Sequence, residues 1–424
     1  MSFGIKTIKD KVSSAVHNKE GRVLMVNFAY LSILQVIGYV FPLITIPYLA
    51  HVIGVEGYGK IAFAASVVVY FQTIVDWGFA YTAVRDIAKN KENVFEVSRI
   101  FSNVMCAKFV LMLVSLSIFT IIIYTIPFFY EYRVVLWATF LLIPGYIMFP
   151  DWLFQAMEEM KYITIMNFVS KIIFTALVFI VIKKESDYFY EPLLTSLGML
   201  LTGIWALWYA QKKFSLTFII PDFKDVLGTI KKSTNMFISL FLPNLYTNFS
   251  VTLLGVVGGE TATGLYSSGK KFVDICDRFS QVMSRAFFPF LARRMDKHDV
   301  YVVISGGFSV VMGLFLFFGA EWLIHLFYTP EFYEAALVLK IMSVAPFFLF
   351  LMNTYGTNYL VLQGREDILR NIIVICSILG FILAWFAILY LSYIGVAVTV
   401  TCVWGIRGLL TCLFALKLKK TLRI

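Results

Sequence analysis

The segment 263–290 places charged and amide side chains at helical spacing inside an otherwise apolar block. With about 100° between successive residues of a helix, these side chains share one face, and in chain order they are Lys270, Lys271, Asp274, Asp277, Arg278, Gln281 and Arg285. An ionisable residue at the centre of a membrane helix costs ~3 kcal/mol, so this face cannot point to lipid. Four basic and two acidic groups leave a net charge of +2 (4 − 2). The chemistry that this face predicts is anion binding.

Two interpretations of this face are open. Lys270 and Asp274, and likewise Asp274 and Arg278, have the i,i+4 spacing of helix ion pairs. One interpretation is therefore an internal network that only holds helices together. The other is the wall of a water-filled cavity. We favour the cavity, because the pairing is incomplete and a buried unpaired cation is costly unless water or an anionic ligand meets it.

Asp76 is a second ionisable group inside an apolar block, the segment 60–83. A carboxylate at such depth is a candidate for function. Three roles are open: a relay of protons or ions, a counter-ion to the cationic face of 263–290, or a partner in the structure alone. Because a nearby cation keeps a carboxylate ionised, we favour the counter-ion over the relay. Lys108 lies toward one end of its own block, so we expect its amine to extend to the membrane surface.

Other apolar blocks contain single polar residues that are candidates for contact with a substrate. They are Asn27, Gln35, Lys171, Asn244 and Arg407. Hydrogen bonding between helices is the alternative, and for any single Asn it is the simpler explanation.

The apolar blocks themselves determine the fold class. Of the 424 residues, 60% are hydrophobic and 15% are charged, whereas soluble domains contain about 25% charged residues. A helix that crosses a bilayer needs about 20 apolar residues, and the blocks have this length. We predict an all-α integral membrane protein with twelve spans, at 24–50, 60–83, 103–125, 134–156, 162–182, 190–210, 233–256, 263–290, 301–320, 336–362, 370–391 and 394–416.

The connecting segments predict the orientation. On the side of the N-terminus they contain 24 Lys and Arg residues, against about four on the opposite side. Basic residues concentrate in cytoplasmic loops, so both termini are predicted to be cytoplasmic.

The two halves of the chain resemble each other, which predicts a duplicated architecture. The corresponding positions are 54–59 with 258–266, Pro144 with Pro346, and Gln155 with Gln363. We predict two pseudo-symmetric lobes of six helices each, residues 1–210 and 233–424, joined by a cytoplasmic linker at 211–232. Each lobe has an even number of spans, so the lobes are related by an axis along the membrane normal and face each other across a central cavity.

No motif for catalysis or for a bound cofactor occurs. The sequence has no HExxH helix, no phosphate-binding loop, and no connecting segment long enough for a nucleotide-binding domain. The four histidines lie far apart and the five cysteines lack CxxC spacing, so neither a metal site nor a disulfide is predicted. Basic residues occupy short loops rather than one surface, which argues against nucleic acid. We predict a transporter rather than an enzyme, an integral-membrane glycan polymerase being the enzyme alternative.

Two motifs in the first part of the chain resemble those of a known family. They are Pro47-Tyr48-Leu49-Ala50 with Gly54 and Gly57-Tyr58-Gly59, and Asp76-Trp77-Gly78-Phe79 with Thr82 to Lys89. They are similar to those of Wzx-type O-antigen flippases, in the polysaccharide-transporter branch of the MOP exporter superfamily, and the likeness extends over the whole chain. His51 and Val55 depart from the pattern, since arginine and proline are usual there.

This resemblance implies a MOP/MATE-like fold and a function. Such a flippase of the bacterial inner membrane moves an oligosaccharide repeat unit linked to undecaprenyl pyrophosphate from the cytoplasmic to the periplasmic leaflet by alternating access. The implied lumen is cationic, which carries over to Lys270, Lys271, Arg278 and Arg285. Implied partners are a coupling ion, H⁺ or Na⁺, a glycan polymerase and a chain-length regulator.

The alternative within the same superfamily is a cation-coupled multidrug antiporter. We expect a pump for cationic drugs to have a lumen of net negative charge. The positive face of 263–290 therefore favours the flippase.

Overall fold

The computed structural model describes residues 19–422, apart from the side chains of some residues inside helices. Within this part of the chain every regular element is a helix. The earlier elements are α2 Lys19–Asp76, α3 Phe79–Lys89, α4 Val94–Thr125, α5 Pro127–Glu131, α6 Arg133–Phe140, α7 Leu142–Met148, α8 Asp151–Ala156, α9 Met160–Val181, η1 Glu185–Phe189 and α10 Tyr190–Lys213. The later ones are α11 Phe223–Phe241, α12 Asn244–Arg293, η2 Met295–Lys297, α13 His298–Phe327, η3 Pro330–Phe332, α14 Ala335–Met342, α15 Ala345–Leu351, η4 Met352–Val361 and α16 Glu366–Leu422.

Three of the longest helices are interrupted once each. In α2 the interruption is Gly54 (φ 65°, ψ −177°), and in α12 it is Gly259 (φ 80°, ψ −177°). In α16 it is Ser392 (φ 49°, ψ −131°). A positive φ is readily adopted by glycine and costly for a residue with a Cβ atom. The two glycines therefore permit sharp, nearly identical turns at corresponding places in α2 and α12.

The join between α2 and α3 is a further interruption, inside the predicted span 60–83. Trp77 (φ 41°) and Gly78 (φ 76°) both have left-handed backbone. The Trp77 ring stacks on Phe237 at 3.9 Å between centroids, and its indole N–H donates to the Ile230 carbonyl at 3.1 Å. These contacts dock the join on α11. Because α11 extends from 223 to 241, it includes part of the predicted linker 211–232.

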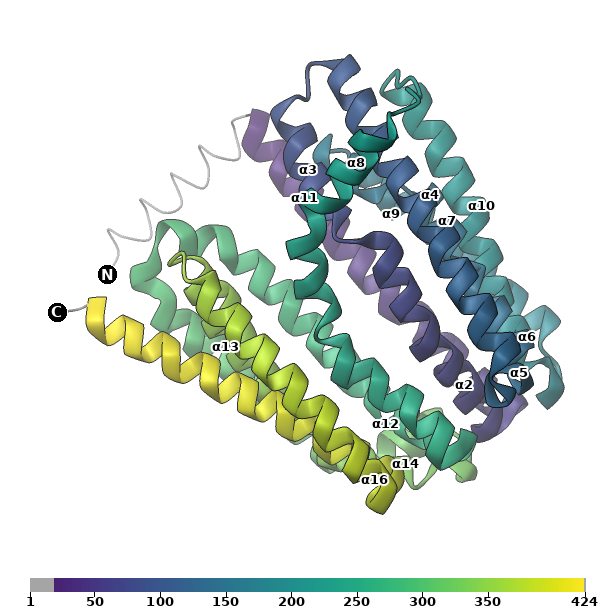
Figure 1. The fold of residues 1–424 in the computed structure, drawn as a ribbon. Helices are drawn as coiled ribbons and strands as arrows, with labels where there is room; N and C mark the ends of the chain where they lie inside the picture. The colour runs from purple at the N-terminus through teal and green to yellow at the C-terminus, as the bar shows by residue number, and fades with distance from the viewer. Residues whose placement is uncertain (1–18, 423–424) are drawn as a thin grey trace.

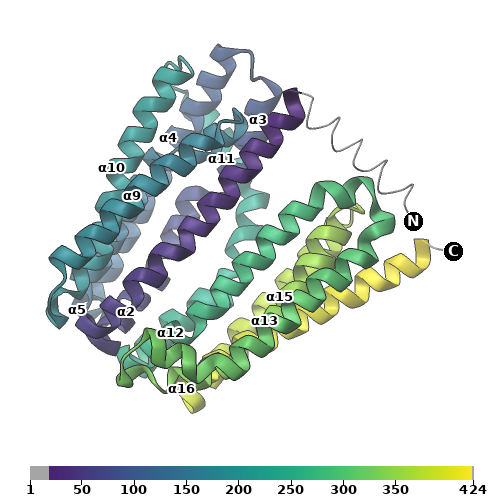
Figure 2. The same ribbon diagram turned by 180° about the vertical axis from the view of Figure 1, so that it is seen from behind.

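The helices form two groups, which Figures 1 and 2 show on opposite sides of the molecule. We call α2 to α10 the N-terminal helix group and α12 to α16 the C-terminal helix group. The groups come together where α2 and α12 are interrupted, and they separate toward the end where α2 begins and α16 ends. We call the first place the closed end and the second the open end.

Two glycines allow the backbones of the two groups to touch at the closed end. A Cβ atom on Gly59 would lie 1.9 Å from the carbonyl oxygen of Glu260, and one on Gly264 would lie 2.3 Å from that of Val55. Such separations are far inside van der Waals contact, so only glycine fits at either position. Gly59 and Gly264 are 205 positions apart (264 − 59), as are Val55 and Glu260 (260 − 55). The two contacts are thus equivalent across the halves of the chain.

Polar and aromatic side chains reinforce the closed end. The backbone N–H of Val55 donates to the Glu331 carboxylate at 3.3 Å, and the Tyr132 hydroxyl donates to the Glu260 carboxylate. The Tyr58 ring meets Phe332 edge-on at 5.9 Å. Each contact joins one helix group to the other.

The contact between Tyr132 and Glu260 stabilises the ordinary charge state of both groups. Burial alone would favour the neutral form of Glu260. The hydrogen bond from Tyr132, a backbone hydrogen bond and the positive charge of Lys60 together outweigh burial and lower the pKa of Glu260 below its usual range. Burial and the same hydrogen bond raise the pKa of Tyr132. The closed end therefore contains an ionised carboxylate bonded to a neutral phenol.

A second pair of equivalent turns follows α8 and η4. The N–H of Glu159 bonds to the Phe154 carbonyl at 2.8 Å, and that of Arg365 bonds to the Leu360 carbonyl at 2.9 Å. Glu158 and Gly364 have positive φ values of 61° and 69°. Both turns are Schellman helix ends, 206 positions apart (364 − 158). The structural register pairs Gln155 with Val361, two positions from the Gln363 that the sequence suggested.

By length and composition, eight stretches of the described chain could cross a membrane. Two of them, Val40–Lys89 and Glu366–Thr421, contain 50 and 56 residues and include the interruptions at Gly54 and Ser392. The segment of α12 that carries the cationic face is not among the eight. Its charges lower its hydropathy, so composition alone does not identify it as a span.

Candidate functional site

A cavity lies between the two helix groups, beside the second part of α12. One compartment has a volume of ≈510 Å³ and is lined by residues of α2, α6, α7, α9, α10 and α12. Tyr58 and Tyr266, which lie next to the closed-end glycines, line this compartment. An adjoining compartment of ≈510 Å³ contains Arg278, seven residues farther along α12 than Lys271. We call the first the inner compartment and the second the outer compartment.

The cationic face predicted from the sequence forms one wall of this cavity. Lys270, Lys271 and Asp274 line both compartments, and Arg278 lines the outer one. The cavity explains why charged residues are tolerated on this face. A network that only holds helices together is therefore not needed to explain them. A role of these residues in binding stays a prediction.

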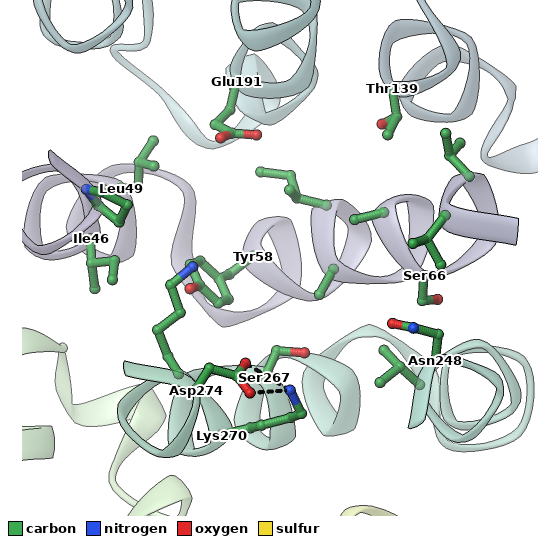
Figure 3. A pocket seen from close by; sticks show the side chains of 18 of the residues that line it. Ile46, Leu49, Tyr58, Ser66, Thr139, Glu191, Asn248, Ser267, Lys270 and Asp274 are labelled. Carbon is green, nitrogen blue, oxygen red and sulfur yellow. Dashed lines mark hydrogen bonds and ion pairs between the residues drawn. The ribbon is translucent and has the colours of Figure 1, made fainter. Parts of the chain in front are cut away.

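One of the two predicted helix ion pairs is formed. The Lys270 amine donates to both carboxylate oxygens of Asp274, at 2.5 and 2.7 Å, as Figure 3 shows. Within the described residues Asp274 forms no ion pair with Arg278. Arg278 is consequently left available for an anion. Lys271, which also forms no ion pair within the described residues, is available too.

The remaining residues of the face continue along α12. Gln281 donates its amide to the Asp277 carboxylate at 2.8 Å. The Arg285 side chain is exposed, and neither it nor Gln281 lines either compartment. The face therefore extends beyond the cavity toward the open end.

Two charged residues of the N-terminal helix group line the inner compartment from the other side. Lys171 of α9 was predicted, and Glu191 of α10 was not. Figure 3 shows the Glu191 carboxylate pointing into the cavity opposite Lys270 and Asp274. In the sequence Glu191 follows Tyr188, Phe189 and Tyr190 at the start of a predicted span. That position is typical of a residue at the membrane surface, so the sequence did not indicate that Glu191 lines a cavity.

Asp76 pairs with a residue of its own helix group. Its carboxylate accepts a hydrogen bond from the Lys108 amine at 2.8 Å, and the two side chains are 43% and 4% exposed. The prediction that Asp76 is the counter-ion of a cation in 263–290 is therefore wrong, and so is the prediction that Lys108 extends to the membrane surface. The physical reason is the packing of α4 beside α2, which has no local signature in the sequence.

The other predicted site residues have different surroundings. Asn244 donates to the Thr73 hydroxyl at 3.2 Å, an interhelical hydrogen bond. Arg407 donates to the Tyr246 hydroxyl at 3.4 Å. Asn27 and Gln35 lie in α2, but their side chains fall outside the described part of the structure.

Comparison with known proteins identifies the family. A model of the family described as "Polysaccharide biosynthesis protein" matches residues 24–295, more than half of the chain. The chain belongs to the polysaccharide biosynthesis protein family. A family relative in Escherichia coli (strain K12), named as a candidate O-antigen transporter, is 26% identical over 385 residues, which cover 88% of this chain and 92% of the relative. The resemblance found in the sequence is thereby confirmed.

Solved structures show the fold of this family member. The lipid II flippase MurJ, in an inward closed conformation, is similar with a TM-score of 0.71 and 14% identity, over 93% of this chain and 87% of that chain. An inward-facing MATE multidrug transporter of the MOP superfamily is similar with a TM-score of 0.58 and 14% identity, over 94% of this chain and 99% of that chain. The chain is a multi-pass membrane protein with a MOP-type fold.

Proposed function

We propose that this protein translocates oligosaccharide repeat units of the O-antigen type, linked to undecaprenyl pyrophosphate, from the cytoplasmic to the periplasmic leaflet. The observation that carries the proposal is the cation-lined cavity between the two helix groups. Four basic residues line it, Lys171, Lys270, Lys271 and Arg278, against Asp274 and Glu191, which leaves a net charge of +2 (4 − 2). A doubly negative pyrophosphate diester matches that charge. The named relative and the fold of a lipid flippase support the same conclusion.

The pyrophosphate binds to the cations that the protein leaves unpaired. Arg278 offers a planar fork of donors that suits phosphate oxygens, and Arg285, farther along the same face, offers a second. Lys270 is already neutralised by Asp274. The isoprenoid tail remains in the bilayer, because its transfer into a polar cavity has no hydrophobic gain.

The predicted arrangement of twelve spans in two six-helix lobes is part of this proposal. A straight helix of 58 residues, the length of α2, would be about 87 Å long, nearly three times the ~30 Å apolar thickness of a bilayer. The chain therefore reverses at Gly54, and by the same reasoning at Gly259 and Ser392. The equivalent turns and glycine contacts at offsets of 205 and 206 support two lobes, 1–210 and 233–424, with the linker 211–232 between them.

The orientation follows from the distribution of Lys and Arg. With both termini in the cytoplasm and the protein in the bacterial inner membrane, the open end faces the cytoplasm. The described conformation is then the inward-facing state of an alternating-access cycle, which receives substrate from the cytoplasmic leaflet. A coupling ion, H⁺ or Na⁺, provides the driving force, and a glycan polymerase and a chain-length regulator act on the exported unit. The protein itself is a transporter without catalytic function.

A multidrug antiporter is the second candidate, favoured only by the fold shared with the MATE transporter. Cationic drugs require a cavity of net negative charge. The net charge of +2 (4 − 2) in this cavity opposes that function.

Substitution of the two arginines tests the proposal. Arg278→Ala and Arg285→Ala should each reduce export of lipid-linked repeat units on the order of tenfold or more, because a hydrogen bond to a charged group contributes about 1.5–3 kcal/mol. Arg→Lys should be partly tolerated, since it keeps the charge. The measurement is surface glycan display at equal membrane abundance. The control is Arg133→Ala, since the half-buried Arg133 lies over the Tyr130 ring and lines neither compartment. Wild-type export in both alanine variants would refute the anion-binding role.

A further inference from the structure

Two lysines from different helix groups converge on the inner compartment. Lys171 belongs to α9 and Lys271 to α12, and both line this compartment. Because both amines border the same compartment, their like charges repel each other across it. Within the described residues neither forms an ion pair or a hydrogen bond through its side chain. Two like charges beside one cavity favour an anion that binds between them.

The only nearby compensation in the described structure is partial. Glu191 of α10 lines the same compartment and interacts electrostatically with Lys271. Lys270 is neutralised separately by Asp274. Lys171, Lys271 and Glu191 therefore leave one excess positive charge (2 − 1) at the inner compartment, sufficient for one further oxyanion.

This cluster is distant from the other end of the cationic face. Lys271 and Arg285 are 14 positions apart on one helix (285 − 271), which corresponds to about 21 Å along its axis. A single pyrophosphate group, whose two phosphorus atoms share one oxygen, cannot bind at both places at once. The face thus offers an anion site near Arg278 and Arg285 and another at the inner compartment.

We propose that Lys171 and Lys271 form a second oxyanion subsite, at which a carboxylate or phosphate group of the substrate binds between the two helix groups and replaces Glu191 as the counter-charge of Lys271. This inference rests on the proposed function. The oxyanion is either the carboxylate of an acidic sugar in the repeat unit or the pyrophosphate of the lipid at a later stage of transport. In either case it connects the N-terminal helix group to the C-terminal one.

Glu191 acts in this subsite as an internal competitor. When the cavity is empty its carboxylate offsets the charge of Lys271, and when the ligand binds, that offset opposes the ligand. Its removal should therefore strengthen ligand binding while the removal of either lysine weakens it. A residue with only a structural role would not produce these opposite signs.

Binding measurements on the purified full-length protein in lipid nanodiscs test the subsite. The probes are undecaprenyl pyrophosphate without sugar, a glucuronate-containing trisaccharide, and the same trisaccharide with the glucuronate reduced to glucose. The variants are Lys171→Gln, Lys271→Gln and Glu191→Gln. The matched control is Lys183→Gln, because Lys183 is exposed outside the cavity.

The expected result is a loss of affinity on the order of tenfold or more in both lysine variants, a gain in Glu191→Gln, and no change in Lys183→Gln. An effect confined to the acidic trisaccharide identifies the sugar carboxylate as the oxyanion, and an effect on undecaprenyl pyrophosphate identifies the lipid phosphate. Unchanged affinity for both anionic probes, or equal losses for the acidic and neutral trisaccharides, would overturn the subsite. If undecaprenyl pyrophosphate fails to bind even to the wild type, the proposed function fails instead.

Discussion

The pair of Asp76 and Lys108 is the most deeply embedded ion pair among the described residues. The Lys108 side chain is 4% exposed, so its ammonium has almost no access to water. A buried charge is tolerated only with a partner, and Asp76 provides it. Asp76 itself is 43% exposed and forms the last residue of α2 before the left-handed turn at Trp77. Its first role is therefore to balance the charge of Lys108 beside a helix end.

Asp76→Asn should destabilise the protein by about 3 kcal/mol, at the lower end of the range for breaking a buried pair, because Asp76 is partly exposed. The double variant Asp76→Asn with Lys108→Met should recover most of that loss, since it removes the unpaired charge. Thermal unfolding in detergent measures both.

An exposed ion pair provides the control for these stability measurements on Asp76 and Lys108. Arg365 and Asp367 are 44% and 53% exposed, so Asp367→Asn should change stability by no more than about 1 kcal/mol. If Asp76→Asn is as stable as the wild type, the pair does not have the role described.

At the residue scale the sequence predicted the charged side chains better than their partners. The cationic face of α12 was predictable because its spacing is local to one helix. The partner of Asp76 is 32 positions away on α4, and Glu191 reaches the cavity from α10. Such pairings depend on how helices pack, and no periodicity along the chain records them.

The crossing of α2 and α12 depends on two glycines. Each allows a backbone carbonyl of the opposite helix to approach where a side chain would stand. Close backbone approach through small residues is a general means of helix packing in membranes. Because the two contacts are equivalent and join the same two helices, we expect both to open together when the closed end opens.

Gly59→Ala and Gly264→Ala should each destabilise the closed end, because the added methyl group would overlap Glu260 or Val55. Overpacking of this kind costs about 1–3 kcal/mol or more. The measurement is the solvent accessibility of a cysteine introduced at Tyr58, compared by the rate of maleimide labelling, which should increase.

Gly307→Ala is the matched control. Gly307 is a helical glycine of α13 with nothing within 4 Å of an added Cβ atom, so alanine there should be neutral or slightly stabilising. Unchanged labelling in Gly59→Ala and Gly264→Ala would show that the crossing tolerates a side chain.

At the element scale the sequence indicated some helix boundaries and missed others. The Gly-rich corners at 54–59 and 258–266 were recognised, and both coincide with interruptions. The interruptions at Trp77 and Ser392 have positive φ at residues other than glycine, which composition does not predict. The predicted span 233–256 is divided between α11 and α12 near Pro243, since tertiary contacts decide where a helix with a proline is broken.

The whole molecule has its interhelical closure at one end, and its cavity lies between that end and the open end. The glycine crossing and the bonds of Val55 to Glu331 and of Tyr132 to Glu260 all lie at the closed end. Alternating access requires these contacts to break while new ones form at the open end. The cavity with its excess charge lies between the two, where a bound anion can influence both.

A covalent link between the helix groups near the closed end should therefore stop transport without preventing binding. Ser66 of α2 and Thr252 of α12 provide the site, because their hydroxyl oxygens are 2.9 Å apart across the two groups. In a background in which the five native cysteines are replaced by alanine, Ser66→Cys with Thr252→Cys should form a disulfide. The oxidised protein should fail to export lipid-linked repeat units, and a reductant should restore export.

The comparison pair for this experiment lies within a single helix group. Ser305 of α13 and Thr354 of η4 have hydroxyl oxygens 3.4 Å apart, and both belong to the C-terminal helix group. Ser305→Cys with Thr354→Cys should therefore form a disulfide that leaves export close to that of the reduced protein. Binding of undecaprenyl pyrophosphate from the open end should persist in both oxidised proteins, because neither link closes the cavity there.

If the protein linked between Ser66→Cys and Thr252→Cys exports as fast when oxidised as when reduced, the helix groups do not separate at the closed end, and alternating access through this cavity is wrong.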